Sequence, residues 1–246
     1  MTFSQALMSL SQSDQNPMLK FHYTNLETCQ TATGLVVVID VIRAFTNAAF
    51  AFSRGAKEIY PVSTVEEALK LKAKIPNAPA CGEVGGLPPE GFDFGNSPTQ
   101  TQTMDLAGCV LVQRTGAGTQ GIVRSVNADI MLAASLVVAS ATVRYIRNLR
   151  ADRVTFVITG QFDEGRGDED FACAEYLEAL LRGEQPDRAP YIDRVYKSRD
   201  ALFHLDPNLP EFPKSDLDYC TDIDAFDFSM SVTKENGRYV MRASKM

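Results

Sequence analysis

The chain has 246 residues, of which 45% are hydrophobic, and its formal net charge is −7 at pH 7. This length and composition can bury a core in one large or two small domains without disulfides or structural metals. The negative charge argues against nucleic acid or an anionic membrane as a partner, because both require a basic surface. A small-molecule function fits these properties better.

The five cysteines are widely spaced and include no C-x-x-C pair, so the sequence predicts free thiols rather than a disulfide framework or a zinc site. The first twenty residues are polar, and no apolar run reaches about 18 residues, the length that a membrane span requires. Neither a signal peptide nor a membrane-spanning segment is therefore expected. We expect the protein to be cytoplasmic.

Strands and helices alternate along most of the sequence. Strands are expected at 21–23, 36–39, 57–62, 78–81, 110–113, 129–134, 153–159 and 222–232. Helices are expected at 44–53, after the capping-box pattern of Thr64 and Glu67, and at 122–126, 136–149 (capped by Ser135), 171–181 and 188–205. This order predicts an α/β fold, layered α/β/α with a mostly parallel or mixed sheet, which could comprise two α/β subdomains.

The expected division of the chain has three parts. Residues 1–33 form a lead-in and an edge strand, 34–206 an α/β catalytic core, and 207–246 a C-terminal strand segment that packs on the core.

The strand at 36–39 is the most apolar one and ends on Asp40, with Arg43 three residues later. Ligand crevices in open α/β sheets form at the carboxyl ends of strands. Asp40 is therefore a candidate metal-binding group, and Arg43 a candidate anion-binding group. The ordinary alternative is that Asp40 caps the following helix and pairs with Arg43.

A long glycine-rich loop covers residues 82–103, and Glu83 stands at its start, directly after a short strand. Loops of this length are usually functional or disordered. Leu87, Phe92 and Phe94 favour a functional loop, since these side chains would not be left in water without a reason. Glu83 thus occupies the same kind of strand-end position as Asp40.

The strand at 110–113 runs into a Gly/Thr turn that contains Thr115, Gly116, Gly118 and Thr119. Backbone amides at a helix N-terminus bind phosphate well, so this turn is a candidate phosphate site. A plain connection between a strand and a helix is the ordinary alternative. The turn has neither the Walker sequence nor the dinucleotide fingerprint, so nucleotide binding is not indicated.

Two covalent phosphatase mechanisms find little support in the sequence. Cys109 and Arg114 could suggest a cysteine phosphatase, but the residues between them form a strand rather than a loop, which would leave a buried and weakly reactive thiol. Asp40 lacks the second Asp two residues later that an aspartyl-phosphate mechanism would use as its acid. A covalent Asp mechanism is unsupported, though not excluded.

Five carboxylates lie between Asp163 and Asp170, before the helix expected at 171–181. They are either a solvated acidic turn or metal ligands, and Glu169 and Asp170 also suit the helix dipole. Together with Asp40 and Glu83 they supply hard oxygen ligands of the kind that Mg²⁺ takes, with substrate phosphate completing its coordination. The combined pattern points to phosphate-ester chemistry.

Five motifs in this order resemble the 2-phosphosulfolactate phosphatases, over roughly residues 34–232. The motifs are Asp40-x-x-Arg43-Ala44, Gly82-Glu83-x-Gly85-Gly86, Gly91-Phe92-Asp93-x-Gly95-Asn96-Ser97-Pro98, Thr115-x-x-Gly118-Thr119 and Glu169-Asp170. The resemblance implies a magnesium-dependent hydrolase that removes phosphate from a phosphorylated sulfo-hydroxy acid on the route to coenzyme M.

Carried over by position, the resemblance implies that Asp40, Arg43, Glu83 and Asp170 are catalytic. Arg43 and the turn from Thr115 to Thr119 would hold phosphate. The metal ligands would be drawn from Asp40, Glu83, Glu169 and Asp170.

Three positions depart from the family pattern: Phe45 replaces a hydroxyl residue, Val84 an arginine and Ala117 an asparagine. The loss of an arginine removes a bidentate partner for phosphate or sulfonate, so the substrate is left open within the phosphatase class. One alternative is a protein that binds a phosphorylated metabolite on an altered phosphatase scaffold. Another is a structural or partner-binding protein. Homodimer formation is also left open.

Overall fold

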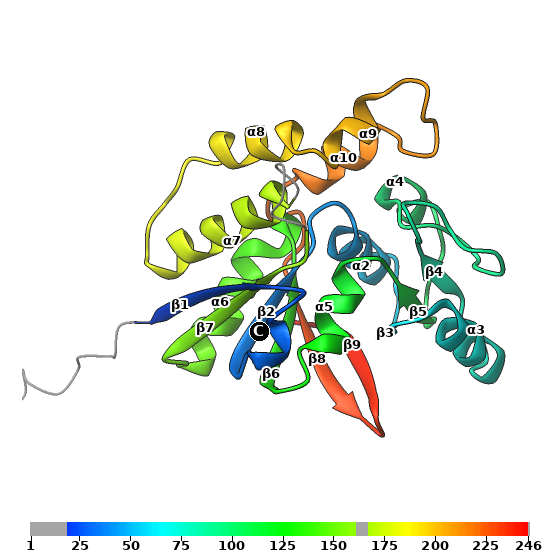
Figure 1. The fold of residues 1–246 in the computed structure, drawn as a ribbon, viewed down its shortest axis with the longest axis horizontal. Coiled ribbons are helices and arrows are strands. Elements are labelled where there is room, and N and C mark those ends of the chain that lie inside the picture. The colour runs from blue at the N-terminus through cyan, green and yellow to red at the C-terminus, as the bar shows by residue number, and fades with distance from the viewer. Residues whose placement is uncertain (1–18, 161–166, 246) are drawn as a thin grey trace, which may run out of the picture.

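The computed structural model describes residues 19–160 and 167–245, which form an α/β fold around a nine-stranded sheet (Figure 1). The strands are β1 (Lys20–Asn25), β2 (Gly34–Ile39), β3 (Glu58–Pro61), β4 (Ala80–Gly82), β5 (Val110–Arg114), β6 (Ala128–Ala134), β7 (Arg153–Ile158), β8 (Ser229–Glu235) and β9 (Arg238–Ser244). Their order in the sheet is β1-β7-β2-β6-β8-β9-β3-β5-β4. The predicted α/β class and mixed sheet are confirmed.

The α-helices of the described chain are α2 (Ala44–Ser53), α3 (Val65–Lys74), α4 (Pro98–Thr101), α5 (Gly118–Arg124), α6 (Ala139–Leu149), α7 (Asp168–Leu181), α8 (Ala189–Lys197), α9 (Ala201–Leu205) and α10 (Ser215–Cys220). Short 3-10 turns occur at η1 (Cys29–Thr31) and η2 (Leu136–Val138). None of the described helices is long and apolar enough to cross a membrane.

Strand β2 is covered on both faces, as its continuous apolar run requires. Val36 and Val38 pack into a core that includes residues of α2 and α5, such as Phe45 and Ile122. The alternate residues of β2, among them Val37, face a second core that contains side chains of α6 and α7. The sheet is therefore the middle of three layers, and β2 delivers Asp40 to its surface.

The C-terminal segment forms a hairpin inside the sheet. β8 pairs antiparallel with β6, and β9 pairs antiparallel with β3, so the hairpin joins the parallel set β1-β7-β2-β6 to the parallel set β3-β5-β4. The strand expected at 222–232 begins too early, and the sequence pattern does not predict β9. Asn236 and Gly237, with φ of 50° and 81°, supply the tight turn that Asn-Gly pairs favour in hairpins.

Two helix predictions also differ from the structure. The sequence predicts that Ser135 caps a helix over 136–149, but its side chain makes no cap hydrogen bond, and η2 precedes the shorter α6. The helix expected at 188–205 is interrupted at Ser198, whose ψ of 155° is extended and separates α8 from α9. All five cysteines are free and buried, which agrees with the absence of a disulfide framework. Asp163 and Glu164 lie outside the described residues.

Candidate active site

Asp40 follows β2 and is almost completely buried, with 4% of its surface exposed. Its Oδ1 accepts a hydrogen bond of 2.8 Å from the backbone N–H of Ala44, in the first turn of α2. Burial raises the pKa of Asp40 to about 6, with a further rise from the charges of Glu83 and Asp200, against the lowering effect of hydrogen bonds from Ala44 and Gly118. Asp40 thus does contact the following helix, as the interpretation of Asp40 as a helix cap predicted. It also belongs to a cluster of acidic groups, since its charge interacts with those of Glu83 and Asp200.

Asp170, at the start of α7, is held by three donors. Its Oδ1 accepts from the N–H of Val41 at 2.7 Å, and its Oδ2 accepts from the N–H of Gly160 at 2.9 Å and from Oγ1 of Thr159 at 3.2 Å. Burial and the charges of Glu169 and Asp40 raise its pKa well above the usual range. Asp170 therefore fixes the start of α7 against the ends of β2 and β7.

Glu169 is buried beside Asp170, with 2% of its surface exposed. Burial raises the pKa of Glu169 to about 8, with further contributions from the charges of Asp200 and Asp40. Its Oε2 has no hydrogen-bond partner among the described residues. A buried carboxylate oxygen without a donor is unusual, because such groups are costly to bury unless they are satisfied.

Glu83 bridges the long loop and the Gly/Thr turn. One carboxylate oxygen accepts from the N–H of Gly86 at 2.8 Å, and the other accepts from the N–H of Gly116. Arg114 donates from Nη1 to the backbone oxygen of Glu83 at 2.8 Å, so this arginine supports the loop. The Gly116 amide, predicted to bind phosphate, is bonded to a carboxylate of the chain itself.

The rest of the turn is closed by two threonines and lies against Asp40. Thr115 N–H donates to Oγ1 of Thr119 at 2.9 Å, and Thr119 N–H donates to Oγ1 of Thr115 at 3.1 Å. A Cβ added to Gly118 would lie 2.7 Å from Oδ2 of Asp40 and 2.7 Å from Cβ of Ala44. Only glycine allows this close approach between the turn and Asp40.

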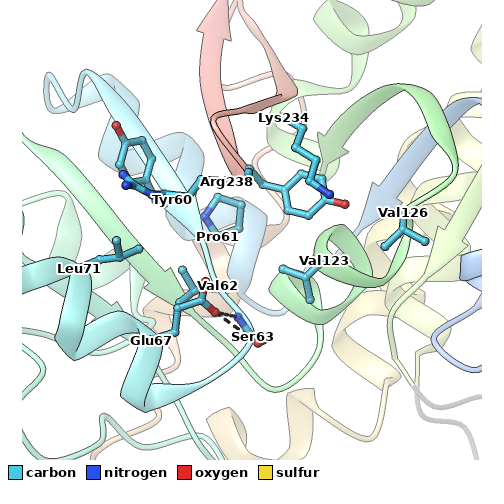
Figure 2. Close-up of a pocket in the computed structure, with 12 residues that line it drawn as sticks. Tyr60, Pro61, Val62, Ser63, Glu67, Leu71, Val123, Val126, Lys234 and Arg238 are labelled. Carbon is cyan, nitrogen blue, oxygen red and sulfur yellow. Dashed lines mark hydrogen bonds between the residues drawn. The ribbon is translucent and has the colours of Figure 1, made fainter.

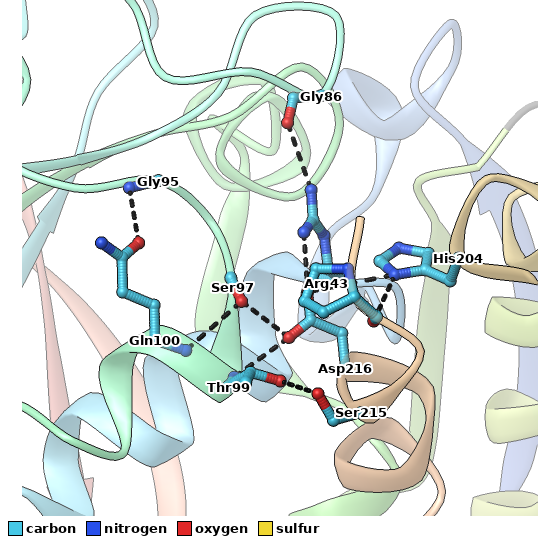
Figure 3. Close-up of polar contacts among 10 residues, drawn as sticks. Arg43, Gly86, Gly95, Ser97, Thr99, Gln100, His204, Ser215 and Asp216 are labelled. Carbon is cyan, nitrogen blue, oxygen red and sulfur yellow. Dashed lines mark hydrogen bonds and ion pairs between the residues drawn. The ribbon is translucent and has the colours of Figure 1, made fainter. Parts of the chain in front are cut away.

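Arg43 is buried, with 5% of its surface exposed, and follows a cis peptide bond after Ile42. Its Nη1 pairs with Oδ2 of Asp216 at 2.8 Å, and its Nη2 donates to the backbone oxygen of Gly86 at 3.2 Å (Figure 3). The guanidinium also lies over the ring of Phe212, 5.2 Å from its centroid. Arg43 therefore does not pair with Asp40.

The sequence analysis missed Asp216, which is fully buried. It lies 173 residues from Arg43 along the chain, in the short helix α10, so no local sequence pattern predicts the pair. The side chain of His204 lies beside this pair, with Nδ1 4.0 Å from Oδ2 of Asp216. Burial and the charge of Arg43 lower the pKa of His204.

The structure brings the predicted residues together across the two parallel sets of strands. Asp40 follows β2 of one set, whereas Glu83 and the Gly/Thr turn follow β4 and β5 of the other. The contacts of Gly118 with Asp40, of Gly116 with Glu83 and of Gly86 with Arg43 link them.

A concavity lies near the tip of the β8–β9 hairpin (Figure 2). It has a volume of about 160 Å³ and is lined by Tyr60, Pro61, Val62, Ser63, Glu67, Leu71, Val123, Val126, Lys234, Gly237, Arg238 and Tyr239. None of the predicted site residues lines it. Its lining includes Lys234, Arg238 and one carboxylate residue, Glu67, and it is separate from the residues that the motifs contain.

In residues 19–160 and 167–245, no three Asp, Glu, His or Cys side chains are grouped closely enough to hold a metal ion as they stand. Both oxygens of Asp170 and of Glu83 already accept hydrogen bonds from the chain. Magnesium binding therefore stays a prediction.

Comparison with known proteins gives a consistent result. The model of the 2-phosphosulpholactate phosphatase family matches residues 21–235. A probable 2-phosphosulfolactate phosphatase of Bacillus subtilis (strain 168) is 34% identical over 200 residues, which cover 81% of this chain and 87% of that protein. The probable 2-phosphosulfolactate phosphatase of Carboxydothermus hydrogenoformans is 33% identical over 224 residues, covering 86% of this chain and 91% of the relative.

A third relative, the probable 2-phosphosulfolactate phosphatase of Thermus thermophilus, is 38% identical over 161 residues, covering 63% of this chain and 66% of the relative. The matched residues include every residue that the five motifs quoted above contain. The chain therefore belongs to the 2-phosphosulpholactate phosphatase family.

Proposed function

We propose that this protein is a phosphatase that hydrolyses 2-phosphosulfolactate, or a small phosphorylated hydroxy acid like it, to the hydroxy acid and phosphate. Family membership supports the reaction class. The observation that carries the proposal is the contact of the Gly/Thr turn with Asp40, where Gly118 leaves no room for a side chain. This contact sets an anion-binding type of turn against a buried acid.

Arg43 and the amides of the turn are the proposed phosphate-binding groups. A guanidinium has five N–H donors, and two of those of Arg43 have acceptors in the described chain, namely Asp216 and Gly86. The charge of Arg43 would stabilise the transferring phosphoryl group in a site from which water is largely excluded. Phosphate would reach the Gly116 amide by replacing the carboxylate of Glu83.

Asp40 is the proposed general base, which takes a proton from the attacking water. With a pKa of about 6 it is mostly ionised at neutral pH yet basic enough to accept a proton. Asp170 is a poorer candidate, since Val41, Gly160 and Thr159 already donate to its two oxygens. We assign Asp170 to the placement of α7, and Glu83 to the placement of the loop and the turn.

The residues present fit a magnesium ion. Mg²⁺ is typically bound by one or two protein carboxylates with substrate phosphate and water, so a group of three is not required. Glu169 would hold the ion, because its Oε2 is unpartnered and burial, together with the charges of Asp200 and Asp40, raises its pKa, which indicates a carboxylate without a compensating cation. When bound, the ion would neutralise charge on the phosphate.

Three positions at which the chain departs from the family pattern bear on the substrate. Val84 is half-exposed in the loop of Gly86, where an apolar side chain offers no charge to a second anionic group of the substrate. Phe45 is completely buried in the core, and Ala117 precedes α5 without a capping hydrogen bond. The second anionic group of the substrate is therefore left open between a sulfonate and a carboxylate. The role in coenzyme M formation rests on the resemblance, and the cytoplasmic location rests on the free cysteines. Homodimer formation is left open.

The test is phosphate release from a panel that includes phosphosulfolactate and phospholactate, each with Mg²⁺ and with EDTA. Metal-dependent release is the expected result, and the preferred acid identifies the substrate. If no compound is hydrolysed while phosphate and Mg²⁺ still raise the melting temperature, the chain is a binding protein on an altered phosphatase scaffold. If neither ligand has an effect, a structural or partner-binding role is supported instead.

A further inference from the structure

We propose that Asp216 is the positioning residue for Arg43, and that it holds the guanidinium in the orientation that receives the phosphoryl group of the substrate. This inference rests on the proposed function, in which Arg43 binds phosphate. Asp216 lies outside every motif that suggested the family, so its role is read from the structure alone.

The carboxylate of Asp216 is fixed at both oxygens. Oδ2 pairs with Nη1 of Arg43 at 2.8 Å, while Oδ1 accepts from Oγ of Ser97 at 2.7 Å and from the N–H of Thr99 at 3.0 Å. Figure 3 shows these contacts converging on Asp216 from Arg43 and from Ser97 and Thr99 at the start of α4. Because the second oxygen is anchored to α4, the carboxylate cannot rotate with the arginine and dictates where the guanidinium lies.

Two further contacts restrict the guanidinium. Its Nη2 donates to the backbone oxygen of Gly86, and the ring of Phe212 lies against its face. A Cβ at Gly86 would lie 2.5 Å from Cζ of Phe212, so the loop and the ring are in tight contact. The amide of the same Gly86 donates to Glu83, whose other oxygen accepts from Gly116.

Gly86 therefore links Arg43 to Glu83, whose carboxylate contacts the Gly/Thr turn. This placement distinguishes Asp216 from a partner that only compensates a buried charge. A pair with a purely structural role would not need to adjoin the predicted phosphate-binding turn. Asp216 is also the negative charge that faces Arg43, while burial and Arg43 itself lower the pKa of the neighbouring His204.

The experiment compares Asp216→Asn with Asp224→Asn as a matched control. The amide that replaces the carboxylate in Asp216→Asn would still accept from Ser97 or Thr99, but the charge that holds Arg43 would be lost. Asp224 likewise accepts from an arginine, Arg188 at 2.5 Å, and from a backbone amide, but it lies outside the site. The affinity for inorganic phosphate is measured by calorimetry, KM and kcat by phosphate release, and the melting temperature by circular dichroism.

We expect Asp216→Asn to weaken phosphate binding and to raise KM by about tenfold to a hundredfold, the scale of a misplaced binding group. Asp224→Asn should change neither value. In the double variant Arg43→Ala/Asp216→Asn, phosphate affinity should equal that of Arg43→Ala alone, since Asp216 acts through Arg43. A structural role would instead lower the melting temperature and leave both constants of the folded protein unchanged.

Unchanged phosphate affinity in Asp216→Asn, or losses that add in the double variant, would overturn the inference. If Asp216→Asn does not fold, Ser97→Ala removes one donor to Asp216 and should weaken phosphate binding by a smaller factor; no weakening there also overturns it. If the wild-type protein binds phosphate but hydrolyses no substrate, the proposed function fails while the affinity comparison still decides the role of Asp216. A wild-type protein that binds no phosphate overturns the inference as well.

Discussion

The substitution Gly118→Ala tests the contact on which the proposed function depends. The new Cβ would lie 2.7 Å from both Oδ2 of Asp40 and Cβ of Ala44, whereas ordinary contacts of a Cβ begin at 3.4 Å. Asp40 or the turn must therefore move by about 0.7 Å, because α2 and β2 are packed on both sides.

The expected change in the free energy of unfolding of Gly118→Ala has two parts. Overpacking of this kind costs roughly 1–3 kcal/mol of the free energy of unfolding, and the gain in helix propensity from Gly to Ala returns roughly 0.5–1 kcal/mol. The net loss should be about 1–2 kcal/mol, so the protein still folds. Catalysis should suffer more, since a displacement of about 1 Å at a reacting group can cost about 100-fold in rate.

The assay combines urea unfolding with phosphate release under saturating substrate. Gly95→Ala is the matched control, because a Cβ there would meet its nearest atom, Cδ of Pro88, at an ordinary 3.7 Å. The control should keep wild-type activity. A Gly118→Ala protein with wild-type kcat would refute the reasoning that the turn and Asp40 form one site.

Three further predictions address the charged residues. Asp40→Asn should lower kcat by about 100-fold or more because the proposed base is lost, while circular dichroism should show a folded protein; retained activity would exclude Asp40 as the base. Arg43→Lys should raise KM by about tenfold, because lysine keeps the charge but not the forked contacts with Asp216 and Gly86, and an unchanged KM would remove Arg43 from phosphate binding. In EDTA, the melting temperature should decrease as the pH rises from about 4 to 8. The folded pKa values of Asp40 and Glu169, about 6 and about 8, exceed their ordinary values. The stability that their protonated forms provide at low pH is therefore lost as the two groups ionise. Mg²⁺ should reduce this fall, and a flat profile in EDTA would contradict the acidic cluster.

The sequence predicted the parts of the fold whose signals are local. The apolar run of β2, the helix over 44–53 and the Thr64 cap of α3 were all recognisable, and Oγ1 of Thr64 does accept from the N–H of Glu67 at 3.1 Å. The pairing of β9 with β3 could not be read in this way, since it joins Ile59 to Met241 and no short window contains both.

The candidate site shows the same division between local and distant signals. Asp40, Glu83 and the Gly/Thr turn were found because each follows a strand directly, and the resemblance to the family is confirmed by the comparisons. Their partners were not found. Ser97 was quoted within a motif without a role, and Asp216 had no motif at all, because a buried pair depends on chain segments far apart in the sequence. The magnesium ligands stay a prediction.

The position of the β8–β9 hairpin has a consequence for how the chain folds. During synthesis, β6 and β3 emerge long before the hairpin, and until it arrives each presents an unpaired row of backbone groups to solvent. The nascent chain therefore carries two incomplete sheets that are prone to pair with other chains, and contacts of such long sequence separation form slowly. Loss of the hairpin would remove the strands that join the part of the sheet carrying Asp40 to the part carrying Glu83.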